Sequence, residues 1–383
     1  MVRRAPVLKP AKKGEVDLLV LAAECSGDEL GAELIGDCIR MDGAVNVWSA
    51  GGNAMAKAGG NFLINVADHS AMGLFDVIRH LPFFLRYCDA VVDWIANALP
   101  KRVCFIDSPS LHLRVAKKLA KMGIAKKAGG PVSLYYYVAP QVWAWKPERK
   151  FEMAKIIDSL AVLFPFEVAH FANTAMATAY VGHPFMDEGC RSPIHYANDG
   201  AMLLLPGSRP AVVRRNFPPM LEAATAPELE EIQPVVSIYP TKAIGEILAE
   251  EVAKVGRDVR LISTDEALKN PVAARLVAVS AGTMSLRCAL EAIPGVIVYR
   301  THPMTYWIGR HHVKLSNLGI ASIILGYEFY PEFIQGAAEP RAMAEKLAQF
   351  IGAGDDFAAV ACELRRELSR PHLKPAQWLM EKL

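Results

Sequence analysis

The stretch that decides the fold is residues 18–32, LLVLAAECSGDELGA, near the start of the 383-residue chain. An apolar run from Leu18 to Ala23 gives way to a polar turn, and a helical pattern then continues through Leu34 and Ile39. This order predicts a strand, a tight turn and a helix, the repeating unit of an open α/β sheet. Ligands of such sheets bind where the strands end, so the turn offers candidate site residues: Glu24, Ser26, Gly27 and Asp28. A plain βα turn with Ser26 or Asp28 as a helix cap explains the same residues.

The same unit recurs in two halves, separated near Gly182-His183-Pro184 and the turn-rich residues 190–200. Strands are expected at 16–23, 45–49, 102–106, 132–138, 159–163 and 179–181, and again at 201–205, 235–238, 259–261, 276–279 and 296–299. Alternation of strands and helices predicts parallel sheets. We therefore expect an α/β protein with two Rossmann-like domains facing a cleft, residues 1–185 and 186–341. Helices of 342–383 are expected to pack back toward the first domain.

Composition narrows the function classes. The net charge of +2 gives no sign of a nucleic-acid partner, and no apolar run reaches the length of a membrane span. No apolar segment of a secretory signal precedes Lys12. The seven scattered cysteines contain no CxxC pair, which is typical of reduced thiols in a cytosolic protein without a zinc site.

Two glycine–hydroxyl turns in the second half suggest a nucleotide site. Pro206-Gly207-Ser208-Arg209 follows one expected strand, and Ser280-Ala281-Gly282-Thr283 follows another. Gly207 allows the backbone to approach a ligand, and Ser208 and Arg209 can bind phosphate oxygens. Each turn alone is also explained by helix capping, but together they favour a sugar nucleotide.

Asp107 ends an expected strand in the first half and can serve as a general base toward a hydroxyl, or simply as a cap of the next helix. The nearby His112 is interpreted as a turn histidine, and no group of residues has the spacing of metal ligands. The aromatic segment 135–145 can line a sugar or acyl site, or pack between domains.

Basic and apolar segments leave a membrane role open. Basic residues gather in the tail, at Arg3, Arg4, Lys9, Lys12 and Lys13, and again over 114–127, while 74–86 is rich in apolar residues. Such segments can hold a protein on an anionic leaflet or bind acyl chains. Solvated helix faces and core packing are the alternatives.

The chain resembles the lipid-A-disaccharide synthase family in a series of motifs that occur in the same order along nearly its full length. The motifs are Glu24-Cys25-Ser26-Gly27-Asp28-Glu29-Leu30-Gly31-Ala32, Met72-Gly73, Ile106-Asp107-Ser108-Pro109, Pro140-Gln141-Val142-Trp143-Ala144-Trp145, Phe164-Pro165-Phe166-Glu167, Val181-Gly182-His183-Pro184, Leu205-Pro206-Gly207-Ser208-Arg209, Gly282-Thr283, Tyr299-Arg300 and Pro331-Glu332-Phe333-Ile334-Gln335.

The resemblance implies a GT-B glycosyltransferase that moves 2,3-diacylglucosamine from UDP to 2,3-diacylglucosamine 1-phosphate. Asp107 would be the base, and the first turn with Met72 and Gly73 would serve the acceptor. The nucleotide would meet the second half at Gly207, Ser208, Arg209, Ser280, Gly282, Thr283, Tyr299, Arg300, Glu332 and Gln335. The resemblance also implies acylated sugar substrates, no metal or cofactor, a cytoplasmic enzyme peripheral to the inner membrane, and leaves room for a homodimer.

The chain departs from the family pattern at several positions. Arg287 replaces a glutamate that commonly holds the nucleotide ribose, although Glu291 lies one turn later. Ser110 and His112 replace an aspartate and an asparagine, and Ser322 ends a segment that usually carries an asparagine. Val212 and Val213 stand where an acidic residue is usual. A divergent or inactive paralogue that binds lipid or scaffolds envelope assembly, and another UDP-sugar enzyme such as a 2-epimerase, remain alternatives.

Overall fold

The computed structural model describes residues 6–67, 74–302, 306–307, 317–369, 371 and 373–381, with side chains of the helix that begins at residue 74 described from residue 82. The chain forms two compact units, which we call unit 1 (residues 1–183 and 371–383) and unit 2 (residues 184–370). None of the helices in these described ranges is both long enough and apolar enough to cross a bilayer.

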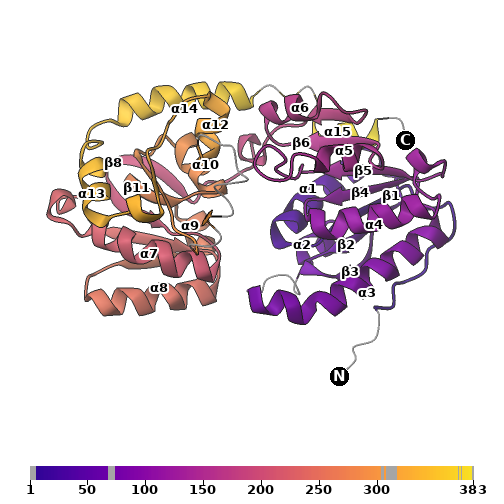
Figure 1. Ribbon diagram of the computed structural model, residues 1–383, viewed down its shortest axis with the longest axis horizontal. Coiled ribbons are helices and arrows are strands. Elements are labelled where there is room, and N and C mark those ends of the chain that lie inside the picture. The colour runs from indigo at the N-terminus through magenta and orange to yellow at the C-terminus, as the bar shows by residue number, and fades with distance from the viewer. Residues whose placement is uncertain are drawn as a thin grey trace. The chain divides into compact units, whose positions relative to one another are not determined.

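Unit 1 is built on a parallel sheet of seven strands in the order β3-β2-β1-β4-β5-β6-β7. Its elements are β1 (Leu18–Ala22), α1 (Cys25–Met41), β2 (Val47–Gly51), α2 (Asn53–Lys57), β3 (Asn61–Asn65), α3 (Leu74–Ala98), β4 (Arg102–Ile106), α4 (Pro109–Lys121), β5 (Ser133–Tyr137), α5 (Arg149–Ala154), β6 (Ser159–Val162), α6 (Pro165–Phe171) and β7 (Ala177–Tyr180). The neighbours α3 and α4 pack their apolar faces onto one face of this sheet (Figure 1). The described aromatic residues of the apolar segment 74–86, Phe83 and Phe84, contact the same core.

Unit 2 contains a second parallel sheet, of six strands in the order β10-β9-β8-β11-β12-β13. Its elements are β8 (Ile194–Leu205), α7 (Pro210–Ala224), β9 (Val235–Tyr239), α8 (Lys242–Val255), β10 (Arg260–Ser263), α9 (Thr264–Lys269), β11 (Val272–Ser280), α10 (Thr283–Leu290), β12 (Gly295–Tyr299), α12 (Ile320–Leu325), β13 (Glu332–Ile334), α13 (Pro340–Ala348) and α14 (Gly354–Leu368). Helices α7, α8 and α13 share one apolar core, and α10, α12 and α14 pack together on the other side of the sheet (Figure 1). The α/β prediction with two sheets is confirmed.

Three strand predictions differ from the structure. The turn-rich residues 190–200 contain the start of β8, because Ile194 and His195 pair with Val272 and Ala273 of β11. The half-buried edge strand β3 and the three-residue β13 were not predicted, because their apolar runs of three and two residues are too short to indicate a buried strand.

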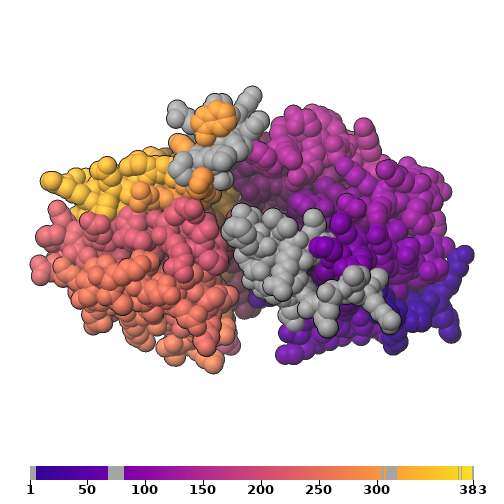
Figure 2. Space-filling model, turned by 60° about the horizontal axis from the view of Figure 1, so that its bottom comes forward, coloured from indigo at the N-terminus to yellow at the C-terminus, as the bar shows by residue number. Residues whose placement is uncertain are grey.

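The C-terminal helices divide between the units, which corrects the expectation that all of 342–383 packs toward the first domain. α13 and α14 belong to unit 2, where α13 packs on α7 and Arg365 of α14 donates to the Leu290 carbonyl at 2.5 Å. In Figure 2 the yellow atoms of this region lie against the pink atoms of unit 2.

Only α15 (Pro375–Met380) joins unit 1, where two groups hold it. The buried Arg102 guanidinium donates to the carbonyls of Leu379 and Glu381 at the end of the helix. Trp378 packs edge-on against Tyr135 at a ring-centre distance of 5.3 Å, and its indole N–H donates to the Ser159 hydroxyl at 2.8 Å. The first tyrosine of the aromatic segment thus serves packing within unit 1.

Replacing Trp378 with alanine should destabilise unit 1, because it removes a buried indole and the hydrogen bond to Ser159. We expect a loss of about 3–5 kcal/mol of unfolding free energy, the usual size for a buried tryptophan. Denaturant unfolding with probes in each unit measures this, and Trp145→Ala, at a tryptophan 38% exposed, is the matched control. An unchanged unit 1 transition would contradict the packing role.

Candidate functional site

Two polar turns meet at adjacent strand ends in unit 1. β1 and β4 are parallel neighbours, with Ala22 opposite Ile106, so the residues after each strand lie at one edge of the sheet. There the Ser108 hydroxyl donates to Glu24 Oε1 at 3.3 Å. The structure thus brings Glu24 together with the Asp107-Ser108 turn, two features that are far apart in the sequence.

The backbone of this turn is strained. Asp107 has φ +48° and Ser108 has φ +47°, the left-handed region that non-glycine residues rarely adopt. Tyr136 donates its hydroxyl to the Asp107 carbonyl at 2.6 Å, and His112 Nδ1 lies 2.7 Å from the same oxygen. The Asp107 N–H donates to the Tyr137 carbonyl at 3.0 Å. The turn is therefore fixed by contacts from β5 and α4.

His112 is a buried support of the turn. Burial lowers its pKa to about 4, so the ring is neutral at physiological pH and its Nδ1–H can donate to the Asp107 carbonyl. Its Nε2 has no hydrogen-bond partner among the described residues. The prediction of a turn histidine missed this buried contact, for which the sequence offers no signal.

The Asp107 carboxyl is half-buried at the open end of β4. Burial raises its pKa and the charge of Glu24 raises it further, while the Ser108 N–H lowers it. A carboxylate with a raised pKa is a better proton acceptor than an ordinary aspartate, which suits a general base.

Asp28 serves the fold. One of its buried carboxylate oxygens accepts from the N–H groups of Gly52 at 2.6 Å and Met55 at 3.0 Å, and the other accepts from Ala54 at 2.9 Å. A Cβ at position 52 would lie 2.5 Å from this carboxylate, so the glycine there makes room for it. Asp28 thus joins α1 to the start of α2.

The other predicted acceptor residues are placed as follows. Gly27 is buried, and a Cβ added there would touch Ala22 and Ile106, whereas Ser26 is exposed on the first turn of α1. Met72 and Gly73 lie outside the described residues.

Unit 2 holds a cavity of about 430 Å³ at the carboxyl ends of its central strands, a size typical of small-ligand sites. Seven of the ten predicted nucleotide residues line it: Gly207, Ser208, Arg209, Ser280, Gly282, Thr283 and Tyr299. Gly207 has φ +119°, and a Cβ there would lie 3.2 Å from Ser280 Oγ, so the turn needs a glycine.

The cavity is suited to an anion. The cavity is lined by the start of α10 at Gly282 and Thr283, and free N–H groups at a helix start attract negative charge. α7 begins with Pro210, which has no N–H group, so Arg209 just before it contributes its side chain instead. Arg209 is exposed and makes no ion pair within the described part of the chain. Its guanidinium is therefore available to a phosphate oxygen.

The remaining three predicted nucleotide residues are not among the described residues that line the cavity. The Glu332 carboxylate accepts from Leu318 and Gly319 N–H at 2.8 Å, and the Gln335 amide pairs with both backbone groups of Thr301. The Arg300 N–H donates to Asn216 Oδ1 at 2.8 Å. Glu332 and Gln335 thus use their polar atoms to shape neighbouring loops.

Asn216 was missed from the sequence, although its signal is present. It is a fully buried polar residue in α7, and its amide donates to the carbonyls of Pro206 and Val298. A lone asparagine between Val213 and Phe217 on an apolar face is such a signal. Asn216 ties the Gly207 turn to the end of β12.

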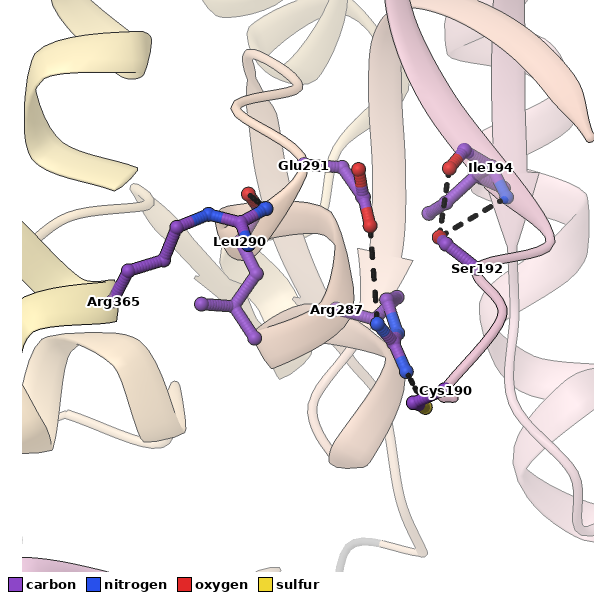
Figure 3. A network of polar contacts seen from close by, with 7 residues as sticks. All are labelled: Cys190, Ser192, Ile194, Arg287, Leu290, Glu291 and Arg365. Atoms are coloured by element: carbon purple, nitrogen blue, oxygen red, sulfur yellow. Dashed lines mark hydrogen bonds and ion pairs between the residues drawn. The ribbon is translucent and has the colours of Figure 1, made fainter. Parts of the chain in front are cut away.

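Arg287 is held away from the cavity. Its buried guanidinium lies 3.7 Å from the Phe185 ring centre and donates to Cys190 Sγ at 2.8 Å. Figure 3 shows it between Cys190 and Glu291, whose carboxylate is 3.8 Å away. Glu291, which could have substituted for the missing glutamate, therefore pairs with Arg287. Ser322 is likewise structural, because its buried hydroxyl accepts from the Phe329 N–H.

Within the described ranges, no three His, Cys, Asp or Glu side chains gather as a metal-binding group. The candidate sites are an aspartate turn in unit 1 and, in unit 2, a cavity whose lining is suited to an anion.

Two units, each built on a parallel sheet covered by helices, form the GT-B fold of glycosyltransferases. Solved structures agree at the level of fold: the kitacinnamycin glycotransferase has a TM-score of 0.60 at 10% identity, covering 96% of this chain and 99% of its own. The calicheamicin glycosyltransferase has a TM-score of 0.56 at 12% identity, covering 96% and 97%. A UDP-N-acetylglucosamine 2-epimerase has a TM-score of 0.52 at 11% identity, covering 94% and 95%.

Sequence comparison gives the family. The family model described as lipid-A-disaccharide synthetase matches residues 18–376, so the chain belongs to that family. The lipid-A-disaccharide synthase of Syntrophus aciditrophicus is 32% identical over 361 residues, with 91% of each chain covered. That of Anaeromyxobacter dehalogenans strain 2CP-1 is 30% identical over 372 residues, covering 92% of this chain and 94% of its own.

Replacing Arg209 with alanine should weaken UDP binding by about ten- to a hundredfold, because one charge-assisted hydrogen bond is worth roughly 1.5–3 kcal/mol. Arg209→Lys should restore only part of the affinity, since lysine lacks the two-pronged geometry. Titration calorimetry measures the affinity, and the ligand-free melting temperature should hardly change. Unchanged UDP affinity with a large loss of stability would mean that Arg209 is structural.

Proposed function

We propose that this glycosyltransferase moves 2,3-diacylglucosamine from its UDP carrier to the 6-hydroxyl of 2,3-diacylglucosamine 1-phosphate. The product is a β-1,6-linked disaccharide, and UDP leaves. The observation that carries this proposal is the family match over residues 18–376. The family match also favours the transferase over a 2-epimerase, to which the chain is similar in fold alone.

In the proposed mechanism the Asp107 carboxylate accepts the proton of the acceptor hydroxyl. The hydroxyl oxygen attacks the anomeric carbon of the donor as the bond from that carbon to the diphosphate oxygen breaks, which inverts the configuration. The raised pKa of Asp107, caused by burial and by Glu24, supports this role. The turn at Gly207, Ser208 and Arg209 and the start of α10 would bind the charge that develops on the leaving diphosphate.

The proposal includes no metal ion and no cofactor, so chelation with EDTA should leave the rate unchanged. Acylated substrates reside in a membrane, and we place the enzyme in the cytoplasm at the inner-membrane surface for that reason. The direct test is UDP release with both acylated sugars present, with UDP-N-acetylglucosamine alone as the control. A folded protein that releases no UDP from the acylated pair would refute the proposal.

Replacing Asp107 with asparagine should lower kcat by about 10²–10⁴-fold, the usual contribution of a general base. UDP affinity, which the proposal assigns to unit 2, should stay as in the unchanged protein. Calorimetry for UDP and a turnover assay separate the two effects. Turnover close to that of the unchanged protein would rule out Asp107 as the base.

The acid side of the pH profile should also move when Glu24 is replaced with glutamine. Asp107 must be ionised to accept a proton, so kcat/KM falls as the pH drops through its raised pKa. Because the Glu24 charge contributes to that rise, Glu24→Gln should shift the acid limb to lower pH. An acid limb that stays in place would show that another group titrates there.

A further inference from the structure

A basic groove runs between α4 and α5 of unit 1, with a volume of about 810 Å³. Two acidic side chains, Glu148 and Glu152, and six cationic ones line it. The cationic residues are Arg114, Lys117, Lys118, Lys121, Lys146 and Arg149.

The groove has an excess of positive charge, because its six cations outnumber its two carboxylates. Lys117 pairs with Glu152 at 2.5 Å, and Lys118 pairs with Asp89 on α3. Within the described residues, the other four cations make no salt bridge, and Lys146 instead lies over the Trp145 ring. Cations three and four residues apart on one helix face repel each other, so α4 carries a cost that a bound anion would remove.

The groove begins at the candidate catalytic turn. Pro109 and Ser110, which line one end, directly follow the Asp107-Ser108 turn. Tyr136 donates its hydroxyl to the Asp107 carbonyl. Arg149 is close enough to Tyr136 for its positive charge to oppose the rise that burial causes in the pKa of Tyr136. One end of the groove therefore lies next to Asp107.

We propose that this groove binds the phosphate monoester of the acceptor sugar, with Arg114 and Arg149 as its principal ligands. This inference rests on the proposed function. An acceptor carries its attacking 6-hydroxyl and its 1-phosphate on the same pyranose ring, so placing the hydroxyl at Asp107 puts the phosphate within one sugar of that turn. Guanidinium groups match a phosphate with two parallel hydrogen bonds, and a cation-lined hollow retains a single anionic group better than a flat surface does.

The decisive experiment varies both the protein and the phosphate. Arg114→Ala and Arg149→Ala, singly and together, are assayed in neutral detergent micelles with the acceptor and with its analogue that lacks the 1-phosphate. For the phosphorylated acceptor, the double variant should lose about ten- to a hundredfold in kcat/KM, mainly through KM. For the dephosphorylated analogue it should match the unchanged protein, and Arg149→Lys should recover part of the loss. Arg341→Ala, at an exposed arginine of α13, is the matched control.

Each of three comparisons between variant and unchanged protein would overturn the inference. The first is an equal loss with both acceptors, which would make the arginines structural. The second is unchanged activity in neutral micelles with a loss only on vesicles that contain phosphatidylglycerol, which would make the groove a surface for membrane headgroups. The third is direct: titration with glucosamine 1-phosphate that gives equal affinity for the unchanged protein and the double variant.

The titration also separates this inference from the proposed function. If the unchanged protein forms no disaccharide from any acceptor, the proposed function fails. If the unchanged protein binds glucosamine 1-phosphate and the double variant does not, the groove is still supported as a sugar-phosphate site. If the unchanged protein does not bind glucosamine 1-phosphate, the inference is overturned.

Discussion

Two consecutive non-glycine residues in the left-handed conformation, Asp107 and Ser108, are the constraint on which the site of unit 1 depends. Each such residue costs about 1–3 kcal/mol and persists only where its surroundings hold it in that conformation. Here the enforcement comes from the Tyr136 hydroxyl and the neutral His112 ring, which share the Asp107 carbonyl. The conformation of the turn fixes the position of Asp107, and the hydroxyl of the next residue, Ser108, donates to Glu24. The candidate base Asp107, the Glu24 contact and the end of the basic groove at Pro109 all depend on this one turn.

The positions that the sequence predicted well are those where local chemistry requires a residue type. Gly207 stands where only a glycine fits its positive φ beside Ser280, and a polar turn after a buried apolar run is visible without any structure. Asp28, Glu332 and Gln335 were harder, because their partners are backbone groups that lie elsewhere in the chain. Asp28 bonds to N–H groups 24–27 residues away, and no spacing rule shows this. A motif identifies such residues but does not tell whether they touch a ligand or hold a loop.

Arg287 illustrates how one unusual residue changes its neighbourhood. Burying a guanidinium removes its hydration, and here contacts with an aromatic ring, a thiol and a carboxylate replace the lost water. Phe185 and Cys190 come from the segment that leads into β8, so Arg287 also fastens that segment to α10 (Figure 3). The cavity of unit 2 keeps its glycine turns and Arg209, and Arg287 takes no part in lining it.

The C-terminal helix has a consequence for how the chain is made. Unit 2 is one continuous segment, whereas unit 1 needs residues 371–383 after the whole of unit 2 has been synthesised. Domains generally fold as they leave the ribosome, N-terminal parts first. Before α15 has been synthesised, Arg102 lacks the carbonyl groups to which it donates, and Tyr135 and Ser159 lack their contacts with Trp378. Unit 1 is therefore the first unit to be synthesised, yet it cannot be completed until the whole of unit 2 has been made.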